Sequence, residues 1–99
     1  MNMNKEEVRQ KIAPVLRRYN VLAASVFGSV ARGEAGDESD IDLVVKVGRL
    51  PLGIWGFIAL KEDLEHALQK KVDLISESAL SSKLKNKIER DLTPIYERT

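Results

Sequence analysis

The feature that most constrains this chain is a pair of short apolar runs separated by a polar, glycine-containing loop. The first run, Val21–Phe27, ends directly at Gly28 and Ser29, and the second leads from Asp40 and Asp42 to residue 47. An apolar run of this length predicts a buried strand, and apolar residues at every second position predict another. The chain is therefore expected to turn at Gly28 and to place two carboxylates at the start of the second strand.

Gly28 and Ser29 predict a phosphate-binding corner. Glycine allows backbone conformations and close approaches that a side chain would forbid. Ser29 can cap a short helix after the strand, and the main-chain N–H groups at a helix N-terminus favour phosphate. A strand followed by Gly-Ser and a helix is a common arrangement, so an ordinary structural turn is the alternative for this step taken alone.

Three aspartates predict a site for divalent metal ions. Asp40 and Asp42 lie two residues apart on a predicted strand, so their side chains share a face, with α-carbons about 6.6–7 Å apart. Asp73 interrupts a third apolar run, Val72–Ile75, where an unpaired carboxylate would be costly. If these strands are neighbours, the three carboxylates converge, and Mg²⁺ binds such oxygen ligands together with substrate phosphates. The alternatives are ordinary surface carboxylates at positions 40 and 42, and an edge-strand aspartate that faces water.

The remaining sequence predicts helices that flank a small mixed sheet. Periodic apolar residues predict helices at Lys5–Tyr19, Phe57–Lys70 and Leu80–Leu92, and an edge strand at Ile95–Glu97. Pro14 is expected to kink the first helix or to delay its start. The order of elements predicts one α/β (α+β) domain over residues 1–99, with about three to four helices against the sheet.

The segment before the second helix contains Gly48, Pro51, Gly53 and Gly56, which predict a loop. Trp55 and Phe57 lie in or beside this loop and are expected to pack onto the core. The alternative is that one of these aromatic residues forms part of a patch that faces a partner.

Composition limits the location and the partners that can be expected. The 99 residues are 43% apolar and 31% charged, as in ordinary globular domains. The chain has no cysteine, which excludes disulfides, thiolate metal ligands and a cysteine nucleophile. The sequence shows no signal peptide and no apolar stretch of about 20 residues, so a cytoplasmic location without a membrane partner is expected. A net charge of +1 gives no reason to expect direct nucleic-acid binding.

The conjunction of the glycine corner with the aspartates resembles a known signature. Gly28-Ser29, ten intervening residues and Asp40-Ile41-Asp42 resemble the motif of the DNA polymerase β-like nucleotidyltransferase superfamily. The fuller strings at residues 28–33 and 39–43 look like its minimal nucleotidyltransferase branch, the MntA-like antitoxins that are paired with HEPN-domain toxins. Lys71–Ile75 is similar to the strand that carries the third carboxylate in that branch. The resemblance extends from about Val8 to Glu97.

This resemblance implies a nucleotidyltransferase fold and a set of roles for the motif residues. Asp40 and Asp42 would bind two Mg²⁺ ions that hold a nucleoside triphosphate. Asp73 would complete one metal site and help to deprotonate the attacking hydroxyl. Gly28 and Ser29 would hold the β- and γ-phosphates. Arg32 would neutralise charge on or near the triphosphate; a structural salt bridge is the alternative for this arginine.

The resemblance also implies a reaction and a partner. ATP would donate AMP to a hydroxyl, expected to be a tyrosine of a cognate HEPN-domain toxin, and the modified toxin would be silenced by its antitoxin. A chain of 99 residues leaves little room beyond the catalytic core, so a folded partner could supply the missing walls of the site. Two alternatives stay open: a non-catalytic module that masks its partner sterically, and a nucleotidyltransferase that acts on RNA 3′ ends or on a small-molecule hydroxyl.

Overall fold

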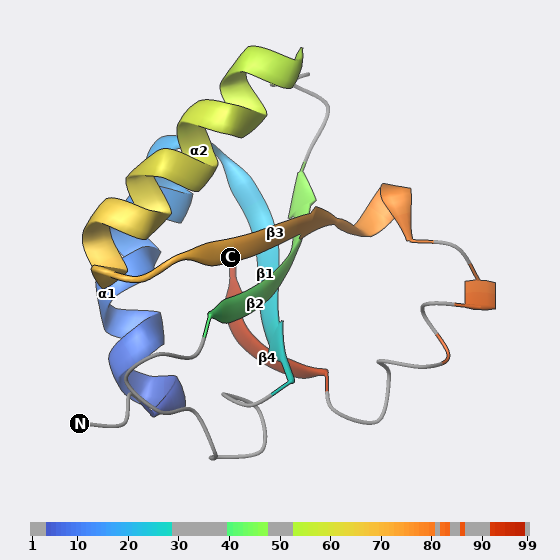
Figure 1. Ribbon diagram of the computed structural model, residues 1–99, viewed down its shortest axis with the longest axis horizontal. Helices are drawn as coiled ribbons and strands as arrows, with labels where there is room; N and C mark the ends of the chain where they lie inside the picture. Colours follow the sequence, from blue (N-terminus) through green and yellow to red (C-terminus); the bar gives the residue numbers. More distant parts are fainter. Residues whose placement is uncertain are drawn as a thin grey trace.

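In the part of the chain that the structure describes, a mixed sheet of four strands is covered on one side by two helices (Figure 1). The computed structural model describes residues 4–28, 40–47, 53–80, 82–83, 86 and 92–98. In chain order, the elements are α1 (Lys5–Arg18), β1 (Val21–Phe27), β2 (Ile41–Val47), α2 (Gly53–Leu68), β3 (Val72–Ser76), the 3₁₀ helix η1 (Glu77–Ala79) and β4 (Thr93–Glu97).

The strands lie in the order β3-β2-β1-β4, so β1 and β2 are central and β3 and β4 are the edges. β1 runs antiparallel to both of its neighbours, whereas β2 and β3 are parallel and are connected through α2. A parallel pair needs such a crossover, because the chain must return to the end of the sheet from which it started. The mixed α/β sheet predicted from the order of elements is confirmed.

The hydrophobic core lies between the helices and one face of the sheet. β2 contributes Ile41, Leu43 and Val45, which are fully buried. Each helix contributes fully buried residues four positions apart, namely Val8, Ile12 and Leu16 from α1 and Leu60, Leu64 and Leu68 from α2. Because side chains alternate along a strand, the residues between the buried ones on β2 face the opposite side of the sheet. That side is where the predicted site residues are found.

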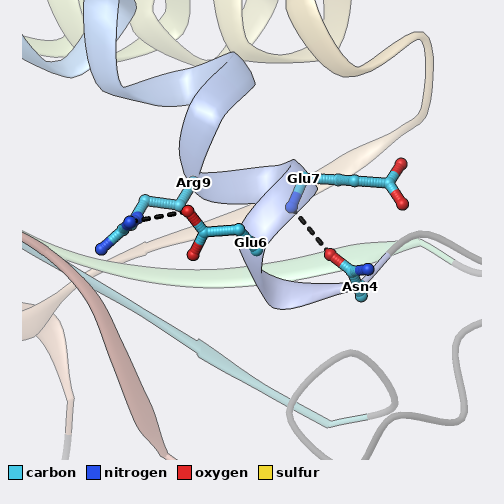
Figure 2. Close-up of polar contacts among 4 residues, drawn as sticks. All are labelled: Asn4, Glu6, Glu7 and Arg9. Carbon is cyan, nitrogen blue, oxygen red and sulfur yellow. Dashed lines mark hydrogen bonds and ion pairs between the residues drawn. The ribbon is translucent and has the colours of Figure 1, made fainter.

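Local capping determines where α1 begins. The Asn4 side chain accepts a hydrogen bond from the Glu7 main-chain N–H at 2.8 Å (Figure 2), and Glu6 and Arg9 form an ion pair at 2.6 Å one turn apart. The cap satisfies one of the unpaired N–H groups of the first turn, while the solvent-exposed ion pair contributes little. The helix runs through Pro14, so a late start at this proline is wrong.

The two helices are joined by a polar contact across their interface. Tyr19, at the end of α1, donates a hydrogen bond to Asp63 of α2 at 2.5 Å. This hydrogen bond, followed by burial and by the negative charge of Asp63, raises the pKa of the Tyr19 hydroxyl. Asn20 follows with a positive φ of 57°, a conformation that ends the helix.

The loop predicted before the second helix is wrong at Gly53 and Gly56, because α2 already begins at Gly53 and includes Gly56. Its earlier part, with Gly48 and Pro51, lies outside the described residues. A glycine within a helix costs only about 1 kcal/mol, and the buried leucines of α2 offset this cost by packing against the core. The early start changes the position of Trp55, which is 81% exposed, so its expected packing onto the core is also wrong. Phe57 does pack against the core, as expected.

The C-terminal part of the chain is described in part. The expected edge strand is confirmed as β4, which begins at Thr93 and includes Pro94. The short helix expected after Ser29, and most of the helix expected at Leu80–Leu92, lie outside the described residues. None of the helices in the described ranges is long and apolar enough to cross a membrane.

Candidate active site

Asp42 and Asp73 occupy paired positions on adjacent strands. The parallel register of β2 and β3 places Asp42 directly beside Asp73, between the pairs Ile41–Val72 and Leu43–Leu74. Neighbouring strands lie about 4.8 Å apart, and laterally paired residues project to the same face. The two carboxylates therefore share the face opposite the helices. Asp73 is both exposed and on an edge strand, so it faces water beside Asp42.

Gly28 brings the end of β1 against the Asp42 carboxylate. Its φ is +72°, in the region that strongly favours glycine. A Cβ atom at this position would lie 2.5 Å from Asp42 Oδ2, closer than two such atoms can approach. The glycine is therefore needed twice, once for its backbone conformation and once because the carboxylate occupies the space of a side chain. The predicted glycine corner is therefore in direct contact with the carboxylate of Asp42.

The other predicted site residues are placed less completely. Asp40 is exposed and lies one residue before β2 begins. Ser29 and Arg32 lie outside the described residues. Within the described ranges, no group of three or more His, Cys, Asp or Glu side chains is arranged to hold a metal ion. The roles assigned to the site residues stay predictions, and the described geometry contains the Asp42–Asp73 pair together with Gly28.

The carboxylate pair fits a hard divalent cation. Two like charges on neighbouring strands repel one another, and a cation between them would remove that repulsion. Mg²⁺ is often held by one or two carboxylates plus substrate phosphates, with water in the remaining positions. The space that a Cβ atom at Gly28 would fill is taken by Asp42 Oδ2, so a cation held by this carboxylate would lie close to the glycine corner. These donors suit a metal–triphosphate complex.

A small cavity lies on the same face of the sheet, further along β2. It measures about 130 Å³ and is lined by residues that include Ala23, Ser25, Val44 and Leu80, with Lys46 and Glu77 also contributing. Its size is comparable to the ~150 Å³ engineered cavity that takes up benzene. Val44 and Lys46 follow Asp42 at every second position of β2, which is the signal in the sequence that could have indicated a cavity lining. Sequence reasoning did not identify either residue as part of a site.

A mixed sheet with a glycine corner against a carboxylate pair suits an enzyme that handles nucleotide phosphates. The family model described as polymerase beta, nucleotidyltransferase, matches residues 10–99. The chain therefore belongs to the polymerase beta nucleotidyltransferase family, and it is a nucleotidyltransferase.

Relatives and solved structures agree with this assignment. MJ0435 of Methanocaldococcus jannaschii, named as a candidate protein adenylyltransferase, is 38% identical over 86 residues, which are 87% of this chain and 91% of the relative. The protein adenylyltransferase MntA of Thermococcus cleftensis is 35% identical over 92 residues, 93% of this chain and 85% of the relative. A crystal structure of a toxin–antitoxin with AMP-PNP matches with a TM-score of 0.77 at 25% identity, over 92% of this chain and 74% of that chain.

Proposed function

We propose that this chain transfers AMP from ATP to a hydroxyl of a protein partner, a tyrosine of a HEPN-domain toxin, and thereby acts as an antitoxin. The observation that carries the proposal is the lateral pairing of Asp42 with Asp73 beside Gly28. The names of the related protein adenylyltransferases support the reaction. The toxin–antitoxin structure with AMP-PNP supports an adenine nucleotide as donor and a toxin as partner.

In this proposal, Asp40, Asp42 and Asp73 hold two Mg²⁺ ions, which when bound would neutralise charge on the triphosphate. Gly28 and Ser29 bind the β- and γ-phosphates through main-chain N–H groups. Arg32 adds a positive charge near the triphosphate. The cavity beyond Asp42, about 130 Å³ in volume, could take up one ring of the nucleoside, because Val44 in its lining lies about 6.6 Å further along β2.

The chemical step balances with the residues of this site and the acceptor. The acceptor oxygen forms a bond to the α-phosphorus, and the bond from that phosphorus to the bridging oxygen of the β-phosphate breaks. Pyrophosphate leaves with the bonding electrons, and the Asp73 carboxylate accepts the hydroxyl proton. The exposed position of Asp73 at the sheet edge suits this role, because an incoming protein can reach it without entering a closed pocket.

The proposal also treats residues 1–99 as one minimal nucleotidyltransferase domain. The family model matches 90 consecutive residues (residues 10–99), and a single hydrophobic core joins both helices to the sheet. In the described part of the chain, Asp73 is exposed rather than enclosed in a pocket. A protein partner that brings its own acceptor residue is therefore favoured over a small-molecule acceptor.

The test compares ATP labelled at the α-phosphate with ATP labelled at the γ-phosphate, in the presence of Mg²⁺ and the cognate HEPN-domain protein. The α-label is expected on the partner and the γ-label is not, because pyrophosphate leaves. Asp42→Asn and Asp73→Asn are each expected to reduce labelling at least about 100-fold. Glu62→Gln, an equally conservative change on the exposed side of α2, is the matched control and should label like the wild type.

Two outcomes would redirect the assignment. If the Asp42→Asn chain still neutralises the toxin in cells, steric masking rather than catalysis is responsible. If the α-label appears on RNA 3′ ends or on a small-molecule hydroxyl but never on the protein, the chemistry stands and the proposed acceptor is wrong. Undiminished labelling of the partner by both aspartate variants would remove the carboxylate pair from the mechanism altogether.

A further inference from the structure

The outer edge of β3 carries free main-chain groups directly beside Asp73. In the described part of the chain, β3 is an edge strand whose only neighbour in the sheet is β2. We propose that this edge is the docking site for an extended segment of the protein acceptor, which adds to the sheet as a further strand and presents its hydroxyl side chain next to Asp73. This inference rests on the proposed function for the identity of the partner.

The hydrogen bonds of β3 show which of its main-chain groups face outward. The Ile41 N–H donates to the Lys71 carbonyl at 2.9 Å, so in a parallel ladder the groups of residues 71, 73 and 75 point toward β2. Those of Val72, Leu74 and Ser76 point away from it. The Val72 N–H confirms this alternation, because it donates outward to Glu65 Oε2 of α2 at 2.9 Å.

Glu65 covers only the beginning of this edge. Its carboxylate occupies the outward Val72 N–H, which limits strand addition at that end. Beyond it, the outward N–H groups of Leu74 and Ser76 make no hydrogen bond to another part of the described chain. The open stretch is therefore short, and it begins one residue after Asp73.

The opposite edge of the sheet is protected in a different way. β4 contains Pro94, which has no N–H to offer, and ends at the charged Glu97. Arg98 then continues the inner hydrogen bonding by donating from its N–H to the Leu22 carbonyl at 2.8 Å. Proline and charge are the usual means of blocking an edge strand. β3 carries the charged Asp73 but contains no proline, so every residue of this edge beside the candidate active site keeps its main-chain N–H.

Strand addition would also position the acceptor for the reaction. A strand added at about 4.8 Å from β3 places the residue opposite Asp73 on the same face as the carboxylate, with the two Cβ atoms about 5 Å apart. Asp42 lies beside Asp73 on β2, the neighbouring strand away from the edge. Main-chain hydrogen bonds would hold many different sequences in this register, while only a residue with a hydroxyl would react. The edge therefore selects an extended peptide segment as the substrate class.

Ser76→Pro tests the docking edge without disturbing the sheet. Ser76 has φ −76° and ψ 135°, which proline adopts readily, and its N–H points away from β2, so no ladder hydrogen bond is lost. Ser76→Ala is the matched control, because it also removes the hydroxyl, which lies 3.0 Å from the Ser78 hydroxyl, but keeps the N–H. Ser76→Pro is expected to raise the Kd for the HEPN-domain protein about tenfold, as for one main-chain hydrogen bond, and Ser76→Ala to leave it unchanged.

Amide hydrogen exchange supplies a second measurement that needs no variant. In the free protein, the amides of Leu74 and Ser76 should exchange faster than those of Asp73 and Ile75, which bond to β2. Adding the HEPN-domain protein without ATP should slow exchange at the two outward amides. Equal Kd values for Ser76→Pro and wild type, or fast exchange at Leu74 in the complex, would overturn the docking edge.

The two proposals fail separately in these experiments. Protection of Leu74 without transfer of the α-label would leave the docking edge in place and refute the transfer reaction. Transfer of the α-label with no protection of Leu74 would support the transfer reaction and refute the docking edge. If the HEPN-domain protein does not bind at all, both proposals are wrong.

Discussion

Replacing Gly28 with alanine tests the contact between the glycine corner and the carboxylate pair. A non-glycine residue at φ +72° costs about 1–2 kcal/mol. The new Cβ would lie 2.5 Å from Asp42 Oδ2, and contacts below 3.0 Å are essentially never seen, so the carboxylate must move by at least about 0.5 Å. Rotating the Asp42 side chain away from its preferred geometry adds about 0.5–1.5 kcal/mol. Gly28→Ala is therefore expected to lower the free energy of unfolding by about 1.5–3.5 kcal/mol.

The larger expected effect is on catalysis. A displacement of about 1 Å at a reacting site can reduce the rate about 100-fold, so Gly28→Ala should reduce transfer of the α-label by one to two orders of magnitude. Gly53→Ala is the matched control, because Gly53 also has a positive φ of 62°, but a Cβ atom added there would meet no other atom within 4 Å. It should lose about 1–2 kcal/mol of stability and keep its activity.

Urea denaturation measures the two stability changes, and labelling of the partner at saturating ATP measures the two activities. The comparison separates backbone strain, which both variants share, from displacement of the carboxylate, which only Gly28→Ala produces. Full activity in Gly28→Ala, or an equal loss of activity in Gly53→Ala, would refute the claim that the corner positions Asp42 for the reaction.

Two further predictions concern the core and the helix interface. Tyr19→Phe removes the hydrogen bond to Asp63 and should lower the free energy of unfolding by about 1 kcal/mol near neutral pH. Because the pKa of Tyr19 is raised in the folded protein, its contribution to stability is fully present below pH 10 and declines as the pH rises through the folded-state pKa. The phenylalanine variant should lack that decline. Identical pH profiles of stability for Tyr19→Phe and the wild type would contradict a stabilising role of this hydrogen bond. Leu64→Ala should cost about 2–5 kcal/mol because Leu64 is fully buried, whereas Trp55→Ser should change stability by less than about 0.5 kcal/mol. Equal urea midpoints of unfolding for these two variants would contradict the described exposure of Trp55. So would tryptophan fluorescence that a soluble quencher fails to reduce in the wild type.

The elements that carry strong local patterns could be predicted from the sequence. The apolar spacing in α1, the alternation in β2 and the short run in β3 each follow from residues a few positions apart. The start of α2 could not be predicted, because Gly53 and Gly56 favour a loop locally and only packing of the later leucines against α1 and the sheet outweighs them. Trp55 was misplaced for the same reason.

The order of amino acids alone determines the residue types of the candidate site, because each belongs to one short segment. They are an acidic pair two positions apart, a third aspartate in an apolar run and a glycine after a strand. Their relation to one another does not. Asp42 and Asp73 are neighbours only because β2 and β3 pair in parallel with this register, and a slip of one residue would place Asp73 on the other face. The open edge beside Asp73 is likewise a property of the strand order, since a strand is an edge only with respect to the strands that the fold places around it.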